Sequence, residues 1–405
     1  MIRIRYTSTK KSTMSSIVFS LILCLILENL KVFDIMGAAL KPIHFILIFA
    51  SVYCFFLKKQ YAIDIITGII FLFIPVLPIF RINDTREWFK SYMIYFIMCI
   101  FMMTTLRHFI SEFRNKYDYY IKILMNVVAF AQILGILQFI FMNFFEYFFL
   151  RDFFGSFQFH YNAVTQSGGM YRAYSLFHEP SFFALVSNFA LAVALFLNST
   201  FFTKRKRIFY IALGIVSVMC TISASGIIVT LALLLSYYLL KSRKPENIIF
   251  YGVVAIIVLG FISRFTNILD PLRRISSELS MEGTSGYERI VTPLLYINKV
   301  FENYPFFGRG LGQEGNIDAI GIIGRYSSVQ NSIFSIITTF GFCSILYYIP
   351  AITYSVRKIS ENRFNIILLV NIWSVYFATG AWCSPDTLLF LILTITICKR
   401  NDENR

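Results

Sequence analysis

Long apolar runs, each close to the length of a membrane-crossing helix, recur along this sequence and constrain its fold more than any other feature. A bilayer core is crossed by about 20 consecutive apolar residues in helical form. Backbone polar groups cannot stay unpaired in lipid, so a spanning segment is a helix or a strand of a closed barrel. The runs are continuous rather than alternating, which predicts helices. Twelve spans are predicted, with ten as the lower bound, at residues 15–34, 38–57, 62–80, 91–109, 119–143, 180–199, 207–222, 224–240, 248–264, 331–350, 364–379 and 386–398.

The overall composition agrees with these runs. Hydrophobic residues make up 57% of the chain and charged residues 15%, whereas soluble globular proteins carry roughly 25% charged residues. This excludes a soluble multidomain enzyme, a disordered chain and a disulfide scaffold. The predicted fold class is therefore an all-α polytopic integral membrane protein.

The spacing of the runs divides the chain into five parts. Five helices are predicted in residues 1–143, followed by a first long loop at 144–179. Four more helices are predicted in 180–264, followed by a second long loop with helical content at 265–330. Three helices and a tail complete the chain at 331–405. The first run follows a basic start and lacks a small-residue cleavage site, so we expect an uncleaved signal-anchor.

The 37 basic residues predict the orientation of the chain in the membrane. Short loops rich in lysine and arginine stay on the cytoplasmic side. Most basic residues fall on that side if both termini are cytoplasmic, and the cluster Lys204-Arg205-Lys206-Arg207 is the strongest signal. Both long loops then face the periplasm. The net charge of +15 is explained by topology rather than by nucleic-acid binding.

Several chemistries leave no trace in the sequence. There is no D-x-D, Walker A, H-E-x-x-H or G-x-S-x-G motif. The seven cysteines form no close pair and the four histidines are scattered, so we expect neither a metal nor another cofactor. The stretch Gly308-Arg309-Gly310-Leu311-Gly312 follows no strand of a βαβ unit, which argues against a nucleotide loop.

Arginines in the two outward loops need an explanation, because positive charge is disfavoured there. A guanidinium is always charged, and its planar donors match phosphate oxygens. Arg172, Arg289 and Arg309 are therefore candidate phosphate-binding residues. The alternative is that they form salt bridges with acidic residues of the same loops. Tyr174 and Tyr287 are candidates for stacking on sugars, or for anchoring at the membrane interface.

The densest chemistry lies in residues 171–181, at the end of the first loop. Pro180 suits the first turn of a helix. Glu179 then lies at the positive end of the helix dipole, where it is a capping charge or a general base that accepts a proton from a sugar hydroxyl. His178 is the second candidate base, since the unperturbed pKa of histidine is about 6.5.

These residues resemble the O-antigen polymerase and O-antigen ligase superfamily. The resemblance rests on four features in order along nearly the whole chain: the R-x5-H-E-P-S segment at 172–181, the turn Ser223-Ala224-Ser225-Gly226, the stretch from Arg289 to Gly312, and Gln330-Asn331 at the start of a span. Members of that superfamily are metal-independent glycosyltransferases that take a glycan from undecaprenyl pyrophosphate at the periplasmic face of the inner membrane. The resemblance implies that Arg172 and Arg289 bind the pyrophosphate and stabilise its charge as it leaves.

Two departures from the family pattern bear on the choice within it. Ligases usually carry a histidine before the asparagine, where this chain has Gln330, which cannot act as a base. Many relatives carry an arginine in the turn at 223–226, which here has none. The turn at 223–226 therefore supplies no third phosphate-binding arginine in this chain. Gln330 and Asn331 are left as candidate glycan contacts.

The predicted function is that of an O-antigen repeat-unit polymerase of the bacterial inner membrane. The predicted partners are an undecaprenyl-pyrophosphate-linked oligosaccharide, the lipid bilayer and a chain-length regulator. Two alternatives stay open. One is an O-antigen ligase, with lipid A-core as the acceptor. The other is a lipid-linked oligosaccharide flippase, although a transporter usually shows charged or broken helices near mid-membrane and an internal repeat.

Overall fold

The computed structural model describes most of the chain, including the segments that carry most of the predicted site residues. The described residues are 2–27, 30, 32–35, 38–56, 62–79, 84–148, 150, 166–167, 169–197, 201–241, 285–313, 331–378, 382 and 384–401. The predicted span at 248–264 and large parts of both predicted long loops lie outside these ranges.

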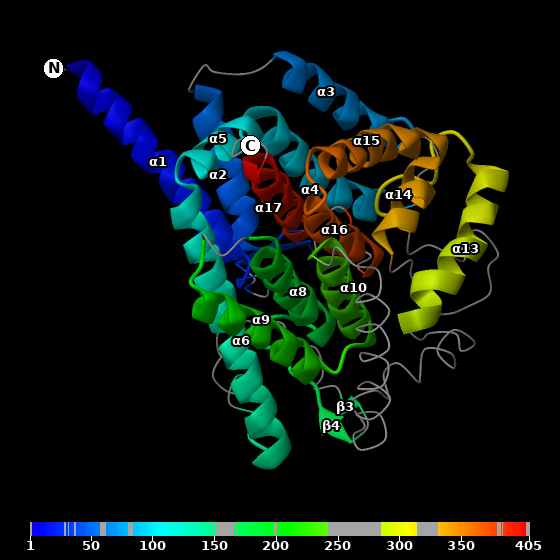
Figure 1. The fold of residues 1–405 in the computed structure, drawn as a ribbon. Coiled ribbons are helices and arrows are strands. Elements are labelled where there is room, and N and C mark those ends of the chain that lie inside the picture. Colours follow the sequence, from blue (N-terminus) through cyan, green and yellow to red (C-terminus); the bar gives the residue numbers. More distant parts are fainter. Residues whose placement is uncertain are drawn as a thin grey trace.

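The described residues form a bundle of helices with two short strand pairs (Figure 1). The predicted all-α class is confirmed apart from these strands. The antiparallel pairs are β1 (Phe33–Ile35) with β2 (Ala38–Leu40) and β3 (Gln166–Ser167) with β4 (Met170–Tyr171). The helices are α1 (Ile2–Cys24), α2 (Pro42–Phe56), α3 (Ala62–Phe73), η1 (Ile74–Val76), α4 (Thr85–Thr104), α5 (Leu106–Asn115), α6 (Tyr117–Phe144), α8 (Pro180–Phe196), α9 (Lys204–Thr221), α10 (Ala224–Lys241), α13 (Ser285–Asn303), α14 (Ser332–Phe340), η6 (Gly341–Ser344), α15 (Ile345–Glu361), α16 (Asn365–Ala378) and α17 (Pro385–Asn401).

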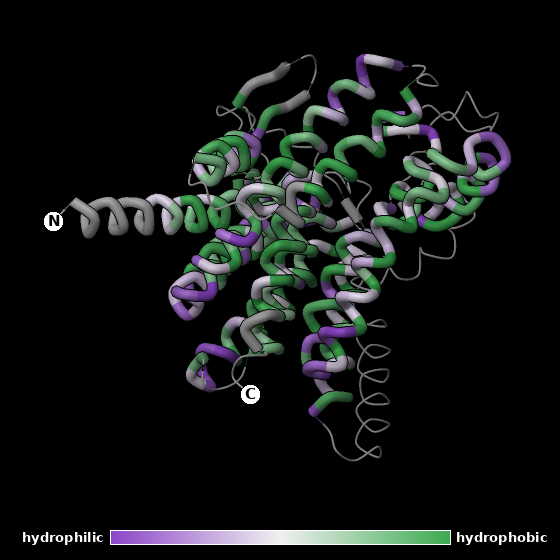
Figure 2. The backbone as a smooth tube through the Cα atoms, turned by 90° about the horizontal axis from the view of Figure 1, so that it is seen from above, coloured by the Kyte–Doolittle hydropathy of each residue, from purple (hydrophilic) through white to green (hydrophobic). Residues whose placement is uncertain are grey.

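Many of these helices are suited to a membrane by length and composition. Within the described ranges, three are long and apolar enough to cross it, namely Tyr117–Phe144, Ala224–Lys241 and Ser332–Glu361, and the bent pair α4–α5 makes a fourth. Shorter apolar helices lie at Thr13–Cys24, Pro42–Phe56, Ile66–Val76, Pro180–Phe196, Asn365–Phe377 and Pro385–Cys398. Figure 2 shows hydrophobic residues along the helices and hydrophilic residues at several of their ends. The total of twelve spans stays a prediction.

The first predicted span differs from the structure at its C-terminal edge. The helix ends at Cys24 rather than continuing to residue 34, and residues 33–35 pair with 38–40 in a hairpin. Aromatic and β-branched residues such as Phe33 and Ile35 favour extended structure. Hydropathy alone does not separate such residues from those of a helix, so the predicted span extends beyond the helix into the first strand.

The predicted span at 91–109 is bent rather than straight. Helices α4 and α5 meet at an angle of 57° at Thr105. The neighbouring Thr104 hydroxyl donates to the carbonyl of Ile100 at 2.8 Å, a hydrogen bond that often bends helices. Beyond the bend, α5 is amphipathic and carries Arg107 and Arg114. Charged residues on one face suit a helix that runs along the membrane surface.

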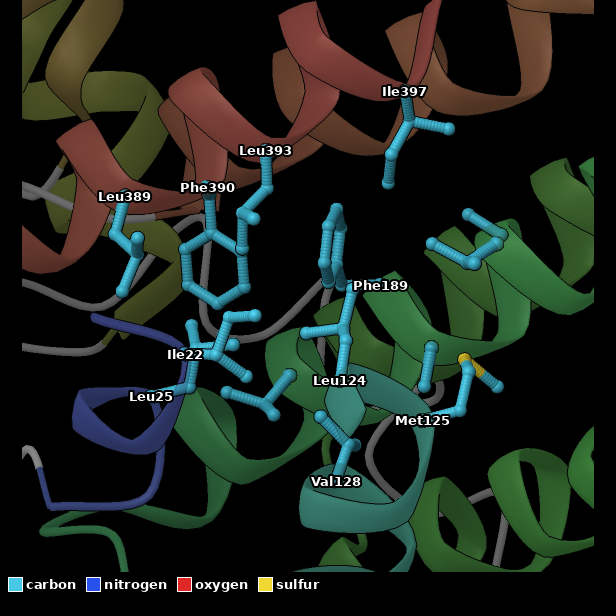
Figure 3. Close-up of a cluster of buried hydrophobic side chains, with 14 of the residues drawn as sticks. Ile22, Leu25, Leu124, Met125, Val128, Phe189, Leu389, Phe390, Leu393 and Ile397 are labelled. Carbon is cyan, nitrogen blue, oxygen red and sulfur yellow. The ribbon is translucent and has the colours of Figure 1, made fainter. Parts of the chain in front are cut away.

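Helix α8 is the centre of the bundle. Helices α6, α9, α10 and α16 pack around it, and every residue from Phe183 to Phe196 is buried. A helix that is apolar all round is covered on all sides by other helices. Figure 3 shows Phe189 of α8 in one cluster with Ile22 of α1, Leu124 of α6 and Phe390 of α17. The core therefore joins the first and last helices of the chain.

The basic cluster at the start of α9 contacts the C-terminal end of α8. Arg207 donates from Nε to the carbonyl of Ala194 and from Nη2 to that of Leu195, both at 3.0 Å. It also donates to the hydroxyl of Tyr237 at 3.1 Å. The last carbonyls of a helix lack intrahelical donors and carry partial negative charge, so a guanidinium stabilises this end. Arg207 is therefore a capping residue of α8 as well as a predicted topology signal.

Candidate active site

Two amide side chains of α6 hold the backbone that leads into α8. The backbone N–H of Tyr171 donates to Oδ1 of Asn143 at 2.7 Å, and Nδ2 of Asn143 donates to the Tyr171 carbonyl at 2.9 Å. The N–H groups of Tyr174 and Ser175 both donate to Oε1 of Gln138, at 2.9 and 2.7 Å. An amide offers donors and an acceptor, so it satisfies backbone groups that have no regular partner. These hydrogen bonds fix the backbone on both sides of Arg172.

Ser175 completes this attachment in an unusual backbone conformation. Its φ is +53°, in the left-handed region that costs a non-glycine residue about 1–2 kcal/mol. Its side chain is fully buried, and Oγ donates to the carbonyl of Ala131 at 2.6 Å. The hydrogen bonds from its hydroxyl and its N–H offset the conformational cost. They turn the chain away from α6 and toward the start of α8.

Arg172 lies at the C-terminal end of α9. Its Nε donates to the carbonyl of Thr221 at 3.0 Å, and the N–H of Ala173 donates to the carbonyl of Cys220 at 3.0 Å. Helix α9 ends there because Ile222 adopts a left-handed conformation with φ +46°. The negative end of the helix dipole favours a cation at this place. The half-buried guanidinium is therefore held by its Nε beside the turn that opens α10.

The turn at 223–226 lies next to this arginine in the structure. The hydroxyls of Ser223 and Ser225 are 3.2 Å apart, and the N–H of Gly226 donates to Ser223 Oγ at 3.4 Å. The first feature of the resemblance and the second thus meet in space. Two hydroxyls, the N-terminus of α10 and a guanidinium therefore lie together in a polar corner.

Glu179 and His178 lie side by side at the start of α8. Glu179 occupies the N-cap position, but its carboxylate makes no capping hydrogen bond to the helix backbone. Instead Ser181 Oγ donates to Oε2 at 2.8 Å, and Nε2 of His178 is 4.0 Å from Oε1. The side chain of Glu179 is 46% exposed and that of His178 is 32% exposed. Both groups therefore reach solvent.

The two tyrosines predicted to bind sugars are placed differently. Tyr174 is only 4% exposed, so its ring belongs to the interior of the protein. A ring that stacks on a sugar needs one open face. Tyr287 lies in the first turn of α13 and is partly exposed. Tyr287 has the accessibility that the prediction needs, whereas Tyr174 contributes chiefly to packing.

Arg289 and Asn331 are brought together although 42 residues separate them. Nδ2 of Asn331 donates to the backbone carbonyl of Arg289 at 3.1 Å. Oδ1 of Asn331 accepts from the N–H groups of Ile333 and Phe334, which makes it the N-cap of α14. Asn331 is fully buried. Its amide therefore holds protein backbone on both sides, while the half-buried Arg289 side chain begins where α13 meets α14.

Residues 304–313, which we call the anchor segment, contact a break in the predicted span at 331–350. Helix α14 stops at Phe340, and the chain continues through η6 into α15. A break leaves backbone groups without helical partners. The anchor segment supplies partners through hydrogen bonds from Arg309 N–H to the Thr338 carbonyl, Gly310 N–H to the Thr339 carbonyl, Phe342 N–H to the Pro305 carbonyl and Cys343 N–H to the Phe306 carbonyl, at 3.0, 3.0, 2.8 and 3.2 Å. The end of the second long loop is thus bonded to the helix break along this stretch.

Glycine is required where the anchor segment touches the break. Gly308 has φ +63°, and a Cβ added there would lie 2.4 Å from the carbonyl of Thr339. The glycine-rich stretch therefore serves backbone packing. Arg309, between these glycines, is 5% exposed and its guanidinium carbon lies 5.7 Å from the centroid of the Tyr304 ring. This burial favours a structural role over direct contact with a phosphate.

Gln313 fastens the far end of the anchor segment to α4, and nothing in the sequence motifs pointed to it. Its Nε2 donates to the carbonyl of Asp84 at 2.9 Å, and the N–H of Asp84 donates to its Oε1 at 3.2 Å. Gln313 is 1% exposed. Gln138 and Asn143 were missed in the same way. The available signal was their type, because amides within apolar spans are costly unless they hold a partner.

The predicted site residues thus fall into two groups. Arg172, His178 and Glu179 lie around the start of α8, and Arg289 lies with Asn331 where α13 meets α14. Gln330 lies outside the described residues. Within the ranges that the structure describes, His, Cys, Asp and Glu side chains form no group of three that could hold a metal ion. The chemistry available in the described part of the site is that of guanidinium groups, a carboxylate and an imidazole.

Comparisons with known proteins place this arrangement in a family. A search of curated proteins finds no match. A family model described as WcaD colanic acid polymerase matches residues 17–400, which covers both groups of site residues and nearly all of the predicted spans. The expected resemblance to O-antigen polymerases is confirmed at the level of the family. The chain belongs to the WcaD colanic acid polymerase family.

Proposed function

We propose that the chain is a repeat-unit polymerase, a metal-independent glycosyltransferase of the bacterial inner membrane. It moves a glycan from undecaprenyl pyrophosphate to the non-reducing end of another lipid-linked repeat unit at the periplasmic face. The family supports a polymerase, and the apolar helices support a membrane location. The observation that carries the site assignment is the attachment of Arg172 by its Nε to the end of α9.

The chemistry is a displacement at the anomeric carbon of the donor. A hydroxyl of the acceptor sugar attacks that carbon, the bond from the carbon to the phosphate oxygen breaks, and undecaprenyl pyrophosphate leaves. A single displacement inverts the anomeric centre. The hydroxyl proton passes to a base, for which the half-exposed Glu179 is the first candidate and His178, 4.0 Å away, the second. A positioned base contributes about 10²–10⁴-fold to the rate.

Arginine side chains stabilise the leaving group. The pyrophosphate gains negative charge as it departs, and preorganised cations aimed at that charge lower the barrier. Arg172 meets this requirement because its Nε is engaged by Thr221, which restricts the motion of the guanidinium. Arg289 is the second such cation, with its backbone held by Asn331. Arg309 is assigned to the anchor segment rather than to the pyrophosphate.

The proposed orientation has both termini in the cytoplasm and twelve spans. Helix α8 supports it, because Glu179 begins this helix and Arg207 caps its other end. A helix of 17 residues is about 25 Å long, close to the thickness of the hydrocarbon core. In the proposed orientation the basic cluster lies on the opposite side of the membrane from the candidate base, in agreement with the positive-inside rule.

The test is the polymer made by a strain that lacks the gene, complemented with wild type or with Arg172→Ala, Arg289→Ala or Glu179→Gln at equal protein levels. We expect single repeat units in the deletion strain, a full ladder with wild type, and no ladder with the arginine variants. Arg357→Ala is the control, because this exposed arginine pairs with Glu361 at the far end of α15. It should leave the ladder unchanged.

The outcomes separate the alternatives. Lipid A-core without any repeat unit in the deletion strain would indicate a ligase or a flippase instead of a polymerase. Full ladders from all three variants would contradict the site assignment and leave the polymerase assignment in place.

A further inference from the structure

Helix α13 contains a proline that leaves one particular carbonyl without its helical partner. In an α-helix the N–H of each residue donates to the carbonyl four residues earlier. Proline has no N–H. Pro293 lies inside α13, so the carbonyl that lacks its usual donor belongs to Arg289. This is the residue that the proposed function assigns to the pyrophosphate.

Asn331 supplies the missing donor from a different helix. Its Nδ2 donates to the Arg289 carbonyl at 3.1 Å. Its Oδ1 at the same time accepts from the N–H of Ile333 at 3.1 Å and from that of Phe334 at 3.4 Å. A buried amide with hydrogen bonds at both ends is fixed in orientation. One side chain therefore joins the N-terminus of α14 to the backbone of the arginine.

The packing below this hydrogen bond continues along the same face of α13. Thr292, Tyr296 and Val300 are buried at intervals of four residues, which places them on one face of the helix. Tyr296 and Val300 pack against Phe334 of α14. On the other side of the helix Leu294 is exposed. Side-chain packing therefore sets the rotation of α13 on α14, and the hydrogen bond to Asn331 fixes its first turns.

We infer that Asn331 is a positioning residue that acts on the reaction through Arg289. The proline frees the arginine carbonyl, the asparagine binds it, and the guanidinium is thereby held at a set place relative to α14. This inference rests on the proposed function for the role of Arg289. Displacing a catalytic group by about 1 Å can cost about 100-fold in rate. The asparagine itself need not touch the substrate.

Cap-preserving substitutions isolate this hydrogen bond. Asn331→Asp keeps an oxygen that caps α14, and an ionised carboxylate has no donor for the Arg289 carbonyl. Asn331→Ser keeps the capping oxygen, but its shorter side chain carries no second group at the position of Nδ2. Asp84→Ser is the matched control, because Asp84 caps α4 with its side chain in the same way. The substrate is the lipid-linked repeat unit extracted from the deletion strain, given to each purified protein in detergent. The quantities measured are kcat, KM and hydrogen exchange of α13.

We expect both Asn331 variants to lose roughly 10- to 100-fold in kcat with KM changed by less than about threefold. The loss falls on kcat because the guanidinium matters most when the leaving group gains charge. Exchange in the first turns of α13 should rise in these variants. Asp84→Ser should match wild type in all three measurements.

A double variant distinguishes positioning from general destabilisation. Because Asn331 acts through the guanidinium, Arg289→Ala combined with Asn331→Ser should be no slower than Arg289→Ala alone. Pro293→Ala restores an N–H to the Arg289 carbonyl, so Asn331→Ser should lower the melting temperature less in that background than in wild type.

Wild-type kcat in both Asn331 variants, or losses that multiply in the double variant, would overturn the inference. If Arg289→Ala itself kept wild-type kcat, the proposed function of Arg289 would fail. The exchange data would still show whether Asn331 holds α13.

Discussion

The two arginines assigned to the pyrophosphate are attached to the protein in different surroundings. Arg172 lies in a segment bonded to α6 and α9, and both helices pack on the central helix α8. Arg289 lies on α13, which stands beside α14 at the edge of the bundle (Figure 1). Its packing cluster is small, with Tyr296 and Val300 as the buried members. The first attachment is part of the main core and the second is peripheral.

Both regions nevertheless use the same device. An amide side chain binds backbone groups next to the arginine: Gln138 and Asn143 in the first region, and Asn331 in the second. Amides suit this task because they are uncharged and carry both donors and acceptors. The comparison suggests that hydrogen bonds decide the position of both arginines, and that burial decides how much the loss of one bond costs.

The largest effect should come from the glycines of the two regions. We expect Gly308→Ala to destabilise the protein by roughly 3–5 kcal/mol, because a left-handed φ is combined with a clash against backbone. The matched change is Gly169→Ala in the first region, where φ is +79° but no atom lies within 4 Å of the added Cβ. It should cost only about 1–2 kcal/mol. Thermal unfolding in detergent measures both, and equal losses would show that the clash is relieved by movement of α14.

The second-largest effect is expected for the two glutamines, Gln138 and Gln313, whose side chains bind backbone groups in the two regions. Gln138→Leu leaves two buried N–H groups without an acceptor, which should cost about 2–5 kcal/mol. Gln313→Leu breaks two hydrogen bonds to Asp84, an exposed residue whose backbone water can reach. Its cost should be about 1–2 kcal/mol. The comparison of the two regions would be wrong if Gln313→Leu proved the more damaging in chemical or thermal unfolding.

A smaller difference should appear between the arginines when charge is kept. Lysine has no fork, so it cannot hold the Thr221 carbonyl and bind phosphate at the same time. Arg172→Lys should therefore lower the polymerisation rate about tenfold, or about 1.4 kcal/mol in barrier height. Arg289→Lys should lose less, because Asn331 holds the backbone and not the side chain. Initial rates of polymer formation by the purified variants measure this difference. A larger loss for Arg289→Lys than for Arg172→Lys would mean that Arg289 is the residue with the stricter geometry.

The smallest effect is expected on the outer face of α13. Lys299 and Glu302 form an exposed ion pair at 3.0 Å. Such pairs contribute about 0–1 kcal/mol, so Lys299→Ala should change stability by less than about 0.5 kcal/mol and leave the polymer ladder unchanged. A large loss of polymer would mean that this face of α13 binds substrate or a partner protein.

The membrane helices were predictable where a helix and an apolar run coincide. The span predicted at 119–143 is α6, and that predicted at 224–240 is α10, within a few residues. Prediction failed where the chain changes structure inside an apolar run. The strands at 33–35 and 38–40 overlap the ends of two predicted spans, and the bend at Thr105 and the break at Gly341 lie within two others. Hydropathy indicates whether a residue suits an apolar environment. It does not indicate the backbone conformation of that residue.

The sequence named candidate residues for the site, and their assignment to it stays a prediction. The structure places Arg172 beside the turn at 223–226, a neighbourhood that the order of motifs along the chain does not predict. Asn331 was predicted as a glycan contact, and the structure shows its amide bound to backbone on both sides. The roles of Glu179 and His178 stay predictions. A motif identifies a residue type at a position, but the partner of its side chain depends on segments elsewhere in the chain.

The sequence by itself determined the helical class, the membrane setting, most helix positions and the polymerase family. Those properties follow from local hydropathy, helical hydrogen bonding and ordered motifs. Only the tertiary structure decided which amide holds which backbone. Gln138 and Ser175 are 37 residues apart, Arg289 and Asn331 are 42 apart, and Asp84 and Gln313 are 229 apart. A single hydrogen bond between distant segments leaves no periodic pattern along the chain, so it becomes visible only when the helices are packed.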